Sequence, residues 1–241
     1  MNPLEFRTGV IKPVEIYKEA WELIKPQYWL VFGVVIVGIL IGSVIPVVTI
    51  GPMMCGIFMC LLKVIDRKPM EFGDLFKGFD FLWKSLPISI AIMGPVFILI
   101  IVMYIPMIGM AIAGSKMSES ELIPFIFGVF IFELIAAFVM VCFHTMLMFA
   151  FPLVADRGLS GIDAIKLSFK AVWGNLAGMA GLLGVGMVIA FVSYLALCVG
   201  VYFAMPLIIM GQAVAFRKVF PAMPESQFQP PPPSSYQGVS N

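Results

Sequence analysis

Long apolar stretches fill most of this chain, and they constrain its fold more than any other feature. Residues 28–62 and 176–216 contain no Asp, Glu, Lys, Arg or His. A single helix over residues 28–62 would be about 50 Å long, whereas the hydrocarbon core of a bilayer is about 30 Å thick. Each of the two stretches is therefore predicted to hold two membrane-spanning helices joined by a short turn.

The composition places the chain in lipid. Its 241 residues are 61% hydrophobic and 12% charged, and the net charge is +1. Soluble domains have roughly 45–50% apolar and about 25% charged residues, so this chain cannot cover itself with polar surface. The near-neutral charge gives no reason to expect a nucleic-acid partner, and we expect membrane lipids to be the main surroundings.

The fold class predicted from these runs is an all-α membrane protein with six transmembrane helices. Pro46 and Gly51-Pro52 are predicted to mark the first turn, and the last turn is predicted near Cys198–Gly200. The predicted spans lie near residues 29–46, 50–65, 86–110, 122–151, and on each side of residues 198–200.

Three amphipathic segments precede the predicted pairs of spans. They run from Pro13 to Pro26, from Phe72 to Trp83, and from Ser160 to Trp173, with apolar residues at helical spacing and charged residues between them. Such helices lie in the membrane interface with their apolar face in the headgroup boundary. Ser160 is expected to cap the third helix, with Asp163 in its first turn.

The chain also has the pattern of an internal repeat. Residues 66–86 and 156–176 align without gaps and share Asp-Arg at the start, Phe79/Phe169, Trp83/Trp173 and Leu86/Leu176. The alternative is that Phe and Trp simply favour interfaces. We predict three repeats, each an interfacial amphipathic helix followed by a helical hairpin. The predicted regions are a lead-in at 1–11, a membrane domain at 12–220 with repeats near 12–66, 67–151 and 156–218, and a disordered Pro-rich tail at 221–241.

The basic residues predict the orientation. Fourteen of the fifteen Lys and Arg residues lie near the chain ends or in the polar segments near 63–84 and 152–174, and only Lys116 lies on the other side. By the positive-inside rule, both termini are cytoplasmic in a cell (inner) membrane, which requires an even number of spans. Residues 1–27 carry alternating charges, so the first span is expected to be an uncleaved anchor.

Polar residues inside the spans are the first functional candidates. Glu133 and His144 share one predicted span, eleven residues apart, which places them on one face, and Gln212 lies in the last span. Ionisable residues at membrane depth are costly and often functional, so the pair could form a proton or cation path. The alternative is structural, with Glu133 neutral and hydrogen-bonded inside the bundle.

Other side chains are interpreted as structural. The four cysteines, Cys55, Cys60, Cys142 and Cys198, lie in apolar runs without metal-ligand spacing, and no metal, cofactor or catalytic residue is predicted. The Asp-Arg pairs could bind lipid headgroups or form a catalytic dyad, but we expect them to cap helix ends and anchor loops at the anionic leaflet. The predicted interfacial anchors are Trp21, Trp83, Trp173, Asp66, Arg67, Asp156 and Arg157.

One segment resembles known proteins. At residues 152–159 (PLVADRGL), Ala164, Ser168 and residues 173–175 (WGN), the chain resembles poorly characterised prokaryotic multi-pass integral membrane families of unknown function. It is also similar to the membrane domain found beside some glycerophosphoryl diester phosphodiesterases. The resemblance implies a membrane architecture and no catalytic residue, because no phosphodiesterase domain is expected after it.

The sequence thus predicts a non-catalytic membrane scaffold, or a component that binds lipids or a protein partner through its interfacial helices or its Pro-rich tail. The alternative is a small-solute or proton-coupled transporter that uses Glu133 and His144. A lipid-modifying membrane enzyme is a third possibility, for which the sequence offers no specific residue.

Overall fold

The computed structural model describes residues 4–113, 118–195 and 199–222, and this part of the chain is helical with no strand, as predicted. Lys116, Cys198 and nearly all of the predicted tail lie outside these residues. The helices are α1 (Pro13–Ile24), η1 (Lys25–Gln27), α2 (Tyr28–Gly42), α3 (Pro46–Ile65), η2 (Phe72–Phe81), α4 (Leu82–Ala113), α5 (Glu119–Met146), α6 (Ala150–Arg157), α7 (Gly161–Trp173), α8 (Leu176–Leu195) and α9 (Gly200–Val219).

Six helical stretches are long and apolar enough to cross a membrane, which agrees with the predicted number of spans. The first turn differs from the prediction, because it lies at residues 43–45 and Pro52 is inside α3. Pro46 instead occupies the first turn of α3, where its missing N–H is not needed. Thr49 closes this turn, since its hydroxyl donates to the Gly42 carbonyl (2.9 Å) and accepts from the Ile45 amide (3.3 Å).

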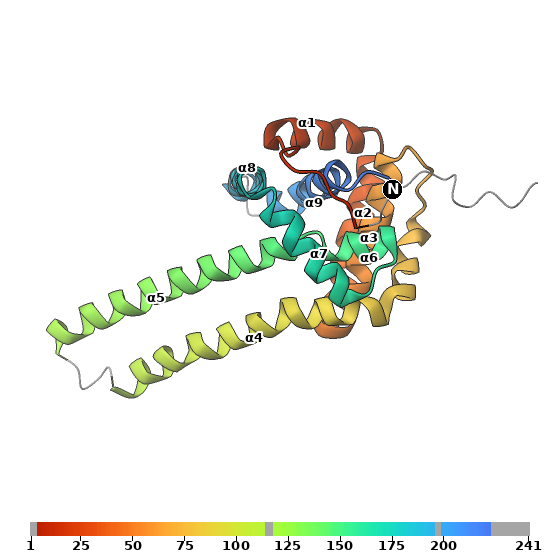
Figure 1. Ribbon diagram of the computed structural model, residues 1–241. Helices are drawn as coiled ribbons and strands as arrows, with labels where there is room; N and C mark the ends of the chain where they lie inside the picture. The colour runs from red at the N-terminus through yellow and green to blue at the C-terminus, as the bar shows by residue number, and fades with distance from the viewer. Residues whose placement is uncertain (1–3, 114–117, 196–198, 223–241) are drawn as a thin grey trace, which may run out of the picture.

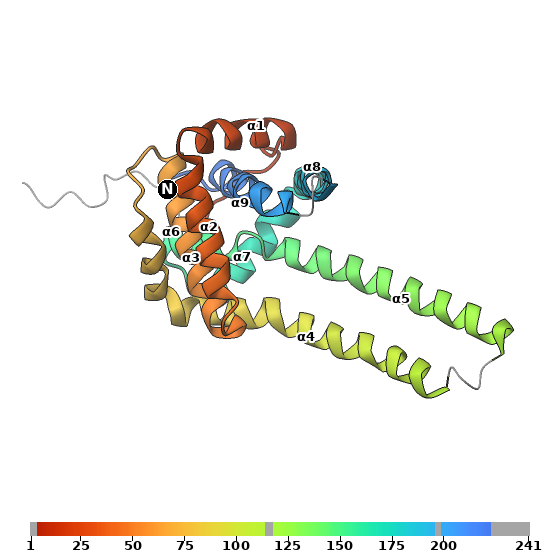
Figure 2. The same ribbon diagram turned by 180° about the vertical axis from the view of Figure 1, so that it is seen from behind.

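The spans form three pairs that extend from one shared base in different directions. The α4–α5 pair projects away from the rest of the molecule, α2 and α3 run across it, and α8 is seen nearly end-on (Figure 1). The opposite view shows the same projecting pair (Figure 2). Along the chain the helices follow the order α1–α2–α3, η2–α4–α5–α6 and α7–α8–α9, so a shorter helix precedes each pair. That these three groups arose by duplication of one sequence remains a prediction.

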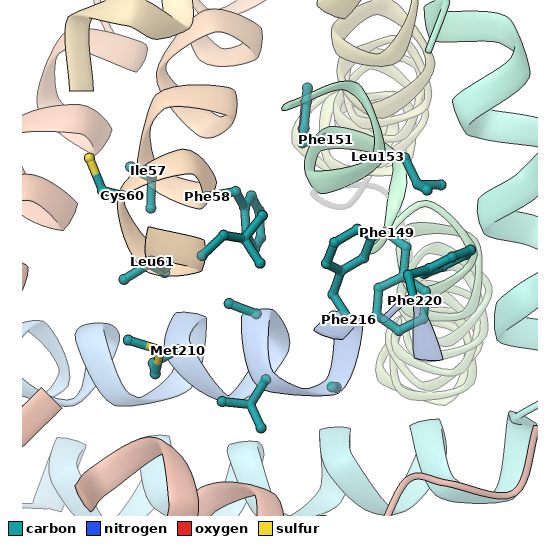
Figure 3. Close-up of a cluster of buried hydrophobic side chains, with 14 of the residues drawn as sticks. Ile57, Phe58, Cys60, Leu61, Phe149, Phe151, Leu153, Met210, Phe216 and Phe220 are labelled. Carbon is teal, nitrogen blue, oxygen red and sulfur yellow. The ribbon is translucent and has the colours of Figure 1, made fainter. Parts of the chain in front are cut away.

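The hydrophobic core lies at the base, where α3, α6 and α9 meet (Figure 3). Phe149, Phe216 and Phe220 pack their rings against one another with centroid distances of 5.1–5.9 Å, and all three side chains are fully buried. Burial of an aromatic side chain stabilises a fold by about 1.5–3 kcal/mol. The base is therefore the firmly packed part of the molecule.

The apolar face of α1 is covered by protein. Ile16, Tyr17, Ala20 and Ile24 are buried, and α1 contacts α9 and α8. The prediction that this face lies in the headgroup boundary is therefore wrong, because the helix uses its apolar residues to pack against the last pair of spans.

The other two amphipathic segments keep large apolar residues at the surface. η2 is a 3₁₀ helix that buries Leu75 and Gly78, while Phe72 and Phe76 are exposed. In α7 the buried face consists mainly of small residues, whereas Ile162 and Trp173 are exposed. An exposed tryptophan such as Trp173 is typical of a membrane interface.

The lead-in that the sequence left without structure packs against the base. Asn175 accepts a hydrogen bond from the Gly9 amide (2.8 Å) and donates to the carbonyls of Arg7 (3.0 Å) and Ala171 (2.9 Å). The Arg7 amide donates to the Val219 carbonyl at 2.9 Å. Residues 7–9 therefore join the start of α8 to the end of α9.

Candidate functional site

A cluster of charged side chains joins the ends of three helices at the base. Arg217, near the end of α9, donates from Nη2 to Asp66 Oδ2 at 2.8 Å. It also makes two bonds to Asp156, from Nη1 to Oδ2 (3.0 Å) and from Nη2 to Oδ1 (2.9 Å). Asp66 follows α3 and Asp156 lies in α6, so one guanidinium connects all three pairs of spans. Two parallel hydrogen bonds between a guanidinium and a carboxylate fix the relative orientation of the two groups and also pair their charges.

The structure changes the interpretation of the Asp-Arg pairs. Only 3% of the Arg157 side chain is exposed, which excludes it from contact with lipid headgroups. Its guanidinium lies 4.9 Å from the centre of the Phe220 ring and donates to the Pro221 carbonyl at 3.3 Å. Arg67 is exposed, with a left-handed φ of 55°, and remains available as an anchor. Asp66 and Asp156 thus hold Arg217, and Arg157 fixes the chain after α9.

The predicted tryptophan anchors lie at the surface. The exposed fractions are 43% for Trp21, 80% for Trp83 and 70% for Trp173. Trp29, at 71%, is equally exposed and was not among the predicted anchors. All four indole rings are thus accessible to a membrane interface.

The polar candidates of the spans line two different cavities. Glu133 is half-buried beside a cavity of about 480 Å³ between α4 and α5, together with Tyr104 and three methionines. No hydrogen bond or ion pair joins its carboxylate to another described residue, contrary to the expectation that it is hydrogen-bonded in a bundle. His144 is absent from this lining, so the structure does not join Glu133 and His144 in one site.

His144 and Gln212 line a second cavity of about 510 Å³, where helices from all three pairs meet. Its lining is otherwise largely apolar, and it includes Met54, Met140 and Met148. The ring nitrogen Nδ1 of His144 lies 2.9 Å from the Met140 carbonyl of the preceding turn. The sequence named two of these polar residues, but could not show that they share a cavity.

Sequence reasoning missed two further polar connections. Asp74 is 2% exposed and pairs with Lys63 (2.7 Å) and Lys77 (2.6 Å), which ties η2 to α3. Ser168 accepts from the Phe149 amide (3.1 Å) and donates to the Met146 carbonyl (2.7 Å), which ties α7 to the bend between α5 and α6. In the described part of the chain, no three His, Cys, Asp or Glu side chains form a metal-binding group.

Comparison with known proteins gives no relative. No protein-family model, curated protein or solved structure matches the chain.

Proposed function

We propose that this protein is a non-catalytic membrane scaffold whose α4–α5 pair binds an apolar segment of a membrane partner. The proposal is supported chiefly by the surface of this pair. Both helices of this pair have almost no covered residues in their most apolar eighteen-residue segments. The buried share of that segment is 0% for the stretch Ser120–Arg157 and 11% for the stretch Phe72–Ile112. The corresponding shares in the first pair are 61% for Pro46–Ile65 and 28% for Pro13–Gly42, so the first pair is covered by protein more than the second.

Glycine positions distinguish a helical partner from plain lipid. A Cβ built on Gly94, Gly109 or Gly128 would meet nothing within 4 Å. On α3, by contrast, a Cβ built on Gly56 would collide with the Leu75 backbone. Glycines on membrane helices allow the close approach of a neighbouring helix, so the three uncovered glycines favour a helix as the occupant.

Photo-crosslinking in the native membrane tests this function. A benzoylphenylalanine at Phe127 or Phe138 on α5 is expected to give a protein adduct of defined mass, whereas one at the equally exposed Trp29 on α2 is not. Gly128→Leu should abolish the adduct, while Gly184→Leu, at an equally uncovered glycine of α8, should leave it. Adducts with lipid alone from both α5 positions would reject the proposal.

We further propose that the protein lies in the cell membrane with both termini in the cytoplasm. The support is the gathering of the basic residues on the side of the base, where Arg67, Lys77, Lys84 and Lys170 precede or follow the spans. A tag at either end should be inaccessible to an impermeant label in intact cells and accessible after lysis. Labelling of intact cells would overturn this orientation.

The alternative function is a small-solute or proton-coupled carrier. The Glu133 carboxylate lies beside a cavity and has no hydrogen bond or ion pair to another described residue, which favours this function, because an acid at membrane depth is costly unless it has a use. The separation of Glu133 and His144 into two cavities argues against a shared path.

A further inference from the structure

The cavity shared by the three pairs has an unusual set of donor atoms. Of its fourteen lining residues, three are methionines and one is His144, and none is Asp, Glu or Cys. Met140 and His144 lie four residues apart on one face at the end of α5, and Met148 lies in the turn that follows this helix. Met54 contributes from α3. Three thioethers and one imidazole therefore line one space.

The imidazole is oriented for binding. His144 Nδ1 lies 2.9 Å from the Met140 carbonyl, which can only accept a hydrogen bond, so Nδ1 carries the proton in the neutral ring. Nε2 then keeps its lone pair, and no other hydrogen bond of the ring is found among the described residues. Histidines that bind metals commonly have this arrangement, with one nitrogen held by a carbonyl and the other free.

We propose that this cavity is a binding site for a soft monovalent metal ion, with Cu(I) as the physiological class. Thioether and imidazole donors together select Cu(I). Calcium and magnesium require oxygen ligands, and zinc sites use thiolate, imidazole or carboxylate, so a lining with one imidazole and no acid or thiolate disfavours all three. Binding of Cu(I) in this cavity requires only coordination by the thioethers and the imidazole, with no change of oxidation state.

The charge balance supports a monovalent ion over a divalent one. None of the described residues that line the cavity is anionic and able to offset a cation, and the cost of burying charge rises steeply with its magnitude. The Gln212 carboxamide is the one strongly polar group besides His144, since Thr145 already donates to the Val141 carbonyl at 2.6 Å. This inference is independent of the proposed scaffold function, because it concerns neither the outer surface of α4–α5 nor its glycines.

Competition with a chromophoric chelator tests the site. Full-length protein in detergent, kept reduced with ascorbate, is titrated with Cu(I) in the presence of bicinchoninate. We expect one equivalent of Cu(I) to be withdrawn from the chelator. Met148→Leu and His144→Gln should each raise the Kd for Cu(I) by at least about tenfold, because even the loss of a group that only orients a metal ligand costs about tenfold to a hundredfold in affinity. Met146→Leu is the matched control, because Met146 ends α5 but is not in the lining.

Two results would overturn the proposal. The first is no withdrawal of Cu(I) by a protein whose unfolding midpoint and helical signal are normal. The second is one bound equivalent that survives both cavity variants and is lost in Met107→Leu, which would place the ion beside Glu133 in the other cavity. Because Met148→Leu conserves side-chain volume, loss of binding in that variant is not explained by misfolding.

Discussion

Asp156 accepts two hydrogen bonds from Arg217, of 3.0 Å and 2.9 Å, although 61 residues separate the two side chains in sequence. The exposed fractions of the two side chains are 16% and 11%. The pair thus holds the end of α6 against the end of α9 in a setting where water screens the charges poorly.

Loss of this carboxylate should destabilise the fold. Asp156→Ala leaves Arg217 with Asp66 as its remaining partner and is expected to lower the free energy of unfolding by about 2 kcal/mol. The apparent unfolding midpoint in detergent measures the effect. Glu15→Ala, which removes the exposed pair of Lys12 with Glu15, is the control and should leave the midpoint unchanged. Equal shifts for the two variants would contradict the role of the cluster.

A second prediction concerns the close approach of η2 to α3. A Cβ on Gly56 would collide with the Leu75 carbonyl, so Gly56→Ala should cost about 1–3 kcal/mol of stability. Gly94→Ala, in α4, adds the same methyl group where nothing lies within 4 Å. The same thermal assay should show a lower midpoint for Gly56→Ala alone, and similar midpoints for both would mean that η2 does not pack on α3.

A third prediction concerns the lead-in. Asn175→Ala removes the bonds to Gly9, Arg7 and Ala171, so residues 4–11 should separate from the base. Hydrogen–deuterium exchange of a peptide covering these residues should become faster, while exchange in α3 stays slow. Gln212→Ala, which removes an amide without a side-chain hydrogen bond among the described residues, is the control. Unchanged exchange in Asn175→Ala would refute this role.

A fourth prediction concerns Glu133 and distinguishes the carrier hypothesis from the scaffold hypothesis. Because this carboxylate has no partner in the described chain, Glu133→Gln should leave the unfolding midpoint unchanged. A clear loss of stability would instead show a structural partner. If the carrier hypothesis holds, the same variant abolishes uptake in a proteoliposome assay that wild-type protein supports, whereas the scaffold function predicts that crosslinking at Phe127 is retained.

The helical architecture could be predicted because each part of it depends on local sequence. Uncharged runs too long for one crossing required two helices, and the structure places a turn at residues 43–45 within the first. Ser160 was predicted as a cap from its own neighbourhood, and it accepts from the Asp163 amide at 3.2 Å. The exact place of the first turn was missed, since Pro46 is compatible with either the end or the start of a helix.

The contacts between distant segments could not be predicted. From the sequence alone, Arg217 is one of the basic residues near the C-terminal end of the chain, and nothing near it in sequence reveals that Asp66 and Asp156 meet it. The apolar stripe of α1 was assigned to lipid because periodicity shows that a face is apolar, but not what covers it. Likewise, helical spacing put Glu133 and His144 on one face, whereas neighbouring helices decide which cavity each one lines.

The position of Arg217 in the chain also sets an order of assembly. Arg217 follows Asp66 by 151 residues in the chain. When the helices are synthesised and inserted from the N-terminus, Asp66 and Asp156 are therefore present before Arg217. During that interval Asp66 and Asp156 lack the guanidinium that joins them, although η2 already packs on α3. Insertion of the last hairpin therefore completes the base, and a nascent chain arrested before α9 lacks the guanidinium that joins Asp66 to Asp156.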